Sequence, residues 1–238
     1  RDGEFMRTLL LVGVIGKIAV SGVVMFSIPL ILSAQGFPPE EIGQALMIYY
    51  IASIVVTKYS ARMVDYLGAN SRNVLFFSAL VGGLGMMLLG LVGLDQKLSG
   101  TFPSILAPLS HLAVLLDGFF VGHGFGQSNT FLIIAGIVLA GMSNGLLAAP
   151  VMTHIDMTEV ANSYGNKAVA ATYLFLERGG HVVGPIVASY LLVIFGQSAL
   201  GIAIFGLVSI ILGGLFLLTS NSPGERKNEL ARGFEKKG

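Results

Sequence analysis

Apolar residues fill the chain in long segments that are interrupted by short polar stretches. A helix needs roughly 20 mostly apolar residues to cross the hydrocarbon core of a bilayer. Five segments meet this length clearly, and a sixth, residues 42–60, is more polar but long enough. The other five are residues 8–32, 73–94, 130–153, 168–195 and 199–219. The pattern predicts an all-α membrane protein with six transmembrane helices.

The composition agrees with this prediction and narrows the chemistry. Hydrophobic residues make up 54% of the chain and charged residues 11%, which is more apolar sequence than a soluble core needs. Cysteine is absent. Disulfides, thiolate metal sites and cysteine nucleophiles are therefore excluded.

The Lys and Arg residues fall almost wholly on one side of the six predicted helices. Of the 14, eleven lie on that side, Lys97 lies opposite, and Lys17 and Arg178 lie within helices. Because cytoplasmic loops collect basic residues, we expect both termini in the cytoplasm, with the protein in a bacterial inner membrane. A seventh helix at residues 102–121 would be broken by Pro103 and Pro108. We therefore interpret residues 95–129 as one long extracytoplasmic loop.

The chain is expected to form a single membrane domain with short ends. Residues 1–5 are interpreted as a linker or an expression remnant, residues 6–220 as the six-helix bundle, and residues 221–238 as a cytoplasmic tail. The tail is too short and too mixed in charge to indicate nucleic-acid binding. The lipid bilayer is the expected environment.

The loops around the second helix carry a family resemblance. A Gly-Phe-Pro turn at residues 36–38 leads into acidic residues at the helix start, and the helix closes with Ala61-x-x-x-Asp65-Tyr66-x-Gly68, followed by Arg72. This resembles the signature cytoplasmic loop of the major facilitator superfamily, Gly-x-x-x-Asp-Arg-x-Gly-Arg-Arg. Asp65 and Gly68 match, and the basic pair is reduced to Arg72. The Gly184–Pro185 pair is also similar to that family's fifth or eleventh helix.

The resemblance implies one major-facilitator-type bundle of two inverted three-helix repeats, favoured as the C-terminal half of a transporter. It implies secondary active transport of a small solute by alternating access, as a symporter or antiporter. Asp65, Gly68 and Arg72 would form the gating loop. A second six-helix half or a homodimer would complete the pore. The alternative is a transporter-like sensor or anchor module of a larger signalling protein, without transport.

The fifth predicted helix holds the densest set of ionisable residues. Tyr173, Glu177 and His181 are spaced i, i+4 and i+8 and are expected to share a face, with Arg178 beside them. Such groups inside a membrane are functional candidates because burying them is costly. They would bind an anionic solute or carry a proton, so coupling to a proton or another ion is compatible with the sequence. The structural alternative is a contact network that braces the bundle. No cofactor is expected.

Uncharged polar residues supply further candidates. Ser143 and Asn144 lie midway along the fourth helix, where they would either hydrogen-bond between helices or contact substrate. A serine hydrolase with Ser143 as nucleophile and His181 as base is disfavoured, because the second helix lacks the accompanying His and Asn. We therefore predict no enzyme. Tyr49 and Tyr50 are candidates for lining a cavity.

The remaining candidates are Lys17 and a group of loop residues. Lys17 lies close enough to the cytoplasmic end of the first helix to reach the interface, so it is either a site residue or a snorkelling one. His111, Asp117, His123 and Gln127 match no metal-ligand spacing, so no metal site is predicted.

Overall fold

The computed structural model describes residues 3–34, 36–65, 70–91, 130–195 and 200–220. Within these ranges every regular element is a helix. Five helices are long and apolar enough to cross a membrane, namely Gly3–Ala34, Pro39–Val64, Ser71–Gly90, Leu132–Asp156 and Leu200–Thr219. The prediction of an all-α chain with apolar helices of membrane-spanning length is confirmed for these five helices. The predicted loop at 95–129 and the tail at 221–238 lie outside the described residues.

The first membrane helix is continuous but changes its winding. It consists of α1 (Gly3–Arg7), α2 (Ile15–Ile18) and α3 (Ile28–Ala34), separated by the π-helical segments η1 (Thr8–Val14) and η2 (Ala19–Ser27). In η2 the Ser27 hydroxyl donates to the carbonyl of Gly22, five residues back, at 2.9 Å. π-Helical turns are rare and occur often at functional sites. Lys17 lies in the short α-helical piece between them.

The first helix begins earlier than the sequence predicted. Residues 1–5 were interpreted as a linker or remnant, whereas Gly3, Glu4 and Phe5 belong to α1 and the side chains of Glu4 and Phe5 are buried. The i, i+4 spacing of buried positions continues from η1 back to Glu4. The core of the bundle therefore includes the start of the described chain.

The turn after the first helix has the chemistry that its sequence indicates. The N–H of Gly36 donates to Ser33 O at 3.0 Å, and the N–H of Phe37 donates to Leu32 O at 3.1 Å. Gly36 has φ +86°, which a residue with a side chain rarely adopts. This pair of bonds is the Schellman arrangement, which satisfies carbonyls at a helix end. The next helix, α4 (Pro39–Asp65), then begins with Glu40 and Glu41 in its first turn, where carboxylates suit the helix dipole.

The predicted fifth helix is interrupted. After α9 (Glu159–Tyr164), the chain forms α10 (Asn166–Glu177) and α11 (Gly179–Ile194), with a break at Arg178. Here the N–H of His181 donates to Arg178 O at 3.0 Å, three residues back, and two glycines follow the break. Glycines and tightened turns weaken a helix locally, which accounts for the interruption. Neither α10 nor α11 alone is long enough to cross a membrane.

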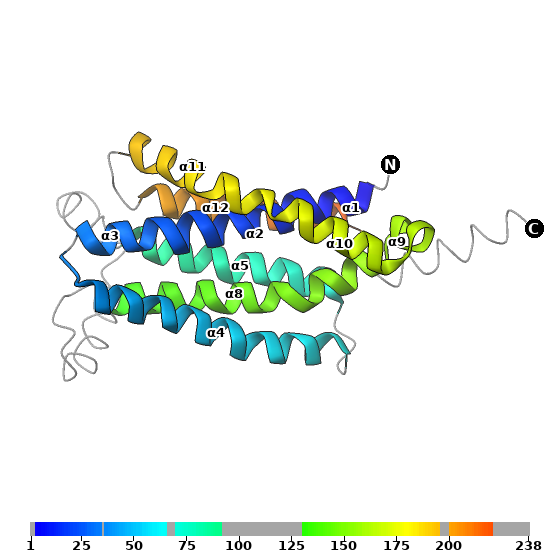
Figure 1. Ribbon diagram of the computed structural model, residues 1–238, viewed down its shortest axis with the longest axis horizontal. Coiled ribbons are helices and arrows are strands. Elements are labelled where there is room, and N and C mark those ends of the chain that lie inside the picture. Colours follow the sequence, from blue (N-terminus) through cyan, green and yellow to red (C-terminus); the bar gives the residue numbers. More distant parts are fainter. Residues whose placement is uncertain (1–2, 35, 66–69, 92–129, 196–199, 221–238) are drawn as a thin grey trace, which may run out of the picture.

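The helices run along one elongated bundle (Figure 1). The helix α8 (Thr130–Asp156) packs against both α4 and α5 (Ser71–Leu91), α5 also packs against α12 (Leu200–Thr219), and α11 lies along the first helix. The two ends of the described chain meet where Ser220 donates to Glu4. The sixth transmembrane helix, which the sequence placed at residues 168–195, stays a prediction. The two inverted three-helix repeats stay a prediction.

Small residues let α11 approach the first helix closely. Gly180, Gly184 and Ala188 lie four residues apart on α11, and all three are buried. A Cβ at Gly180 would lie 2.6 Å from the carbonyl oxygen of Val14, which is too close for any real side chain. This stripe of small residues fixes how α11 sits on the helix that carries Lys17.

Candidate functional site

An ion pair joins the first helix to the end of α10. Lys17 Nζ lies 3.3 Å from Glu177 Oε1, and the two side chains are 23% and 8% exposed. Glu177 is the last residue of α10, directly before the break. Both residues were candidates from the sequence, but their contact was not predicted. A charge pair removed from water needs close contact to offset desolvation, so each residue holds the other in place.

Tyr173 lies one turn before Glu177 and is fully buried. Its ring packs edge-on against Phe5, with centroids 6.1 Å apart. Its hydroxyl faces Gly13, where any side chain would collide with it. This hydroxyl is close enough to the Glu177 carboxylate to interact with it electrostatically. Tyr173, Glu177 and Lys17 thus form one buried group, which we call the mid-helix site.

His181 and Arg178 lie beside this group on the exposed side. The sequence placed Tyr173, Glu177 and His181 on one face, but His181 is exposed while the other two are buried. At about 100° per residue, eight residues carry a helix about 80° past its starting direction. Gly180, seven residues from Tyr173, takes the buried position instead. His181 remains within electrostatic range of Lys17, Glu177 and Arg178.

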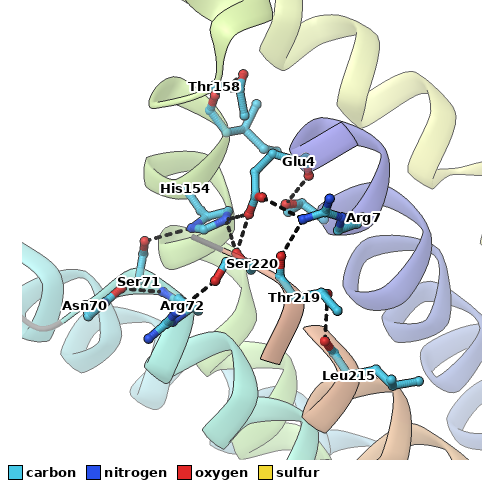
Figure 2. Close-up of polar contacts among 12 residues, drawn as sticks. Glu4, Arg7, Asn70, Ser71, Arg72, His154, Thr158, Leu215, Thr219 and Ser220 are labelled. Atoms are coloured by element: carbon cyan, nitrogen blue, oxygen red, sulfur yellow. Dashed lines mark hydrogen bonds and ion pairs between the residues drawn. The ribbon is translucent and has the colours of Figure 1, made fainter. Parts of the chain in front are cut away.

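A second group of polar side chains lies at the end of the bundle where the described chain begins and ends (Figure 2). We call it the terminal cluster and define it as Glu4, Arg7, Ser71, Arg72, His154 and Ser220. Glu4 Oε1 lies 3.1 Å from His154 Nε2 and accepts a hydrogen bond from the Ser220 hydroxyl. The other ring nitrogen, His154 Nδ1, lies 3.1 Å from Ser71 Oγ. These contacts connect α1, α5, α8 and the residue after α12.

Two arginines complete the terminal cluster at the end of α12. Arg7 lies 3.4 Å from Glu4 Oε2 and also donates to the carbonyl of Thr219. Arg72 Nη1 donates to the carbonyl of Ser220 at 2.8 Å. The last carbonyls of a helix have no partner within the helix, and basic side chains commonly satisfy them. These contacts give the terminal cluster a structural role at this end of the bundle.

Sequence reasoning missed the terminal cluster. Arg72 was assigned to a gating loop, Glu4 was left outside the fold, and His154 was given no role. One signal was present: His154 directly follows the apolar fourth segment, where a polar residue needs a partner. Asp65 is the last residue of α4, and Gly68 lies outside the described residues, so Arg72 alone of the proposed gating residues is placed by its contacts.

Ser143 and Asn144 hydrogen-bond between helices. The Ser143 hydroxyl donates to Ser78 O at 2.8 Å, and the Ser78 hydroxyl reaches Ser143 O at the same distance. Asn144 Nδ2 donates to Ser53 Oγ at 2.8 Å. These bonds join α8 to α5 and α4, so both side chains act here as contacts between helices.

The two tyrosines of α4 face different surroundings. Tyr49 is buried in the apolar core, and its hydroxyl has no hydrogen-bond partner among the described residues. Tyr50 is 48% exposed, and its hydroxyl lies 3.5 Å from the sulfur of Met25. The rings meet edge to face, 5.3 Å apart. Neither tyrosine belongs to the mid-helix site.

A small cavity of about 40 Å³ lies where the first helix, α5, α8 and α12 meet. Gly16, Ser78, Ser143 and Ser209 are among the residues that line it. One water needs roughly 10–15 Å³, whereas a drug-sized ligand needs about 300 Å³ or more. The cavity therefore has room for a few waters but not for an organic solute. No group of three metal-ligating side chains occurs within the described ranges, and His111, Asp117, His123 and Gln127 lie outside them.

The helical architecture and the five apolar helices indicate a membrane protein. No protein-family model, curated protein or solved structure matches the chain. Function must therefore be argued from the geometry of the two polar groups.

Proposed function

We propose that this chain is one helical bundle of a secondary transporter that moves a small solute by alternating access. The observation that carries the proposal is the Lys17–Glu177 ion pair at the break between α10 and α11. Ionisable groups in membrane helices mark solute or ion pathways by default, since burying them without function is costly. Transporters place such groups at interrupted helices near the bilayer midplane.

Three further features support this proposal. Arg178 and His181 are exposed next to the pair, and exposed charge at membrane depth needs cover from protein or water. The cavity where the first helix, α5, α8 and α12 meet is too small for an organic solute, so we place the solute site at the exposed face instead. A second six-helix half or a second copy of the chain would close it. The resemblance of the Asp65–Arg72 loop leads us to a major-facilitator-type bundle in a bacterial inner membrane.

The test is solute uptake into proteoliposomes that contain the protein. A radiolabelled panel of amino acids, organic acids and organic amines would be offered under an imposed pH or sodium gradient. We expect gradient-driven uptake of at least one class. Glu177→Gln should lower it about tenfold or more, because a charged hydrogen bond of about 1.5–3 kcal/mol is lost.

The matched control is Glu159→Gln, which removes an exposed carboxylate at the start of α9. It should leave uptake unchanged. If the wild-type protein moves no member of the panel under either gradient, transport is refuted and the sensor or anchor alternative gains. Uptake that survives Glu177→Gln would keep transport but remove the ion pair from the mechanism.

A further inference from the structure

The mid-helix site and Arg178 beside it together contain more positive than negative charge. Residues 5–39 contain no Asp or Glu, and Glu177 is the only acidic residue in 160–195. Lys17 contacts Glu177, and His181 lies within electrostatic range of Lys17, Glu177 and Arg178. Arg178 forms no ion pair with a described residue. Lys17 and Arg178 together outnumber Glu177 by one charge, so one cation at this depth is left unbalanced.

The basic groups also lie in front of the acid. Glu177 is buried with 8% of its side chain exposed, whereas Lys17 is 23% exposed and Arg178 and His181 are exposed. Beside Arg178, a Cβ built on Gly179 would meet no atom within 4 Å. The surface at the break is therefore open. A ligand approaching it meets three basic side chains before it meets the carboxylate.

We propose that the mid-helix site binds a monovalent carboxylate, which pairs with Arg178 and takes the place of Glu177 on Lys17. This inference rests on the proposed function and names the substrate class of the same site. One negative charge balances the excess of one positive charge, whereas a doubly charged phosphate exceeds it. Arg178 presents a planar group that accepts a carboxylate with two parallel hydrogen bonds. Glu177 then acts as an internal competitor for the solute.

Because Glu177 competes with the solute for Lys17, the direction in which Glu177→Gln changes the binding affinity identifies the charge of the ligand. The probes are benzoate, benzamide and benzylammonium, which share a shape and carry charges of −1, 0 and +1. Binding to the purified full chain in detergent is measured by microscale thermophoresis. We expect benzoate alone to bind. Glu177→Gln should tighten benzoate binding several-fold, because the anion no longer displaces a carboxylate.

The basic residues should respond in the opposite direction. Arg178→Gln, which alters an exposed side chain, should weaken benzoate about tenfold or more. Lys17→Met leaves Glu177 buried without its cation, so the double variant Lys17→Met/Glu177→Gln is tested beside it. It should also lose benzoate binding while keeping the fold. The control is Lys58→Met, which removes an exposed cation on a different helix, α4. It should bind benzoate as the wild type does.

Two outcomes of the binding assay overturn the proposal. In the first, benzylammonium or benzamide binds better than benzoate, and in the second, Glu177→Gln abolishes the binding of benzoate. The assay separates this inference from the proposed function. If the wild-type protein transports only a cation or a neutral solute, transport stands and the carboxylate assignment fails. If benzoate binds with the expected variant pattern but no solute is moved, the carboxylate site stands and transport fails.

Discussion

His154 has no exposed surface, yet both of its ring nitrogens lie within hydrogen-bond distance of side-chain oxygens. Its ring also packs edge-on against Phe216, with centroids 5.4 Å apart. One side chain therefore fills space against α12 and satisfies the buried carboxylate of Glu4. Polar groups buried in this way cost free energy when a partner is lost.

Replacing His154 should destabilise the protein. In His154→Leu, Glu4 loses one partner but keeps Arg7 and Ser220, so the free energy of unfolding should fall by roughly 1–3 kcal/mol. The measurement is thermal unfolding in mild detergent, followed by the loss of helical circular dichroism. Lys167→Gln, at an exposed position near the start of α10, should leave the midpoint unchanged. An unchanged midpoint in His154→Leu would show that the terminal cluster contributes nothing to stability.

At the level of helices, the apolar segments predicted the helix positions well, but they did not predict where a helix is interrupted. The predicted segment 199–219 became Leu200–Thr219, and 73–94 became Ser71–Leu91. The break at Arg178 was missed because glycines within an apolar run are also compatible with close packing in membranes. Gly180 and Gly184 do pack closely, whereas Gly179 lies in the open at the break.

These neighbouring glycines give a matched pair of substitutions. A Cβ at Gly180 would lie 2.6 Å from Val14 O and 2.8 Å from Lys17 Cβ, whereas at Gly179 it would meet nothing. Gly180→Ala should therefore cost about 1–3 kcal/mol through overpacking and push Lys17 away from Glu177. Gly179→Ala should be neutral or slightly stabilising, because alanine favours helix. Equal unfolding midpoints for the two variants would contradict this packing of α11 on the first helix.

For the whole molecule, hydropathy and charge predicted the class and the approximate passes, but not which polar residues meet. Lys17 and Glu177 are 160 positions apart, and no local pattern pairs them. The same holds for Glu4 and Ser220, which meet across almost the full length of the bundle sequence. Contacts of this kind depend on how helices pack, so the candidate residues of the mid-helix site could be named from the sequence, but their geometry could not.

The one-sided distribution of basic residues makes the topology testable. The chain has no cysteine, so single cysteines report position without interference. With Ser99→Cys, a membrane-impermeant maleimide added outside intact cells should label the protein, because the loop is predicted to be extracytoplasmic. With Ser222→Cys it should label only after the membrane is opened. The reverse pattern would invert the proposed orientation.

The meeting of Glu4 with Ser220 also sets an order of events during synthesis. The two residues are 216 positions apart, so at about 5–20 residues per second Glu4 waits roughly 10–40 s for its partner. Until then the Glu4 carboxylate on the first helix lacks the hydrogen bond from Ser220. The ribosome must therefore deliver α12 before this end of the bundle closes. In a nascent chain that stalls earlier, Glu4 would have Arg7 beside it but not the Ser220 hydroxyl, so this end of the bundle would stay incomplete.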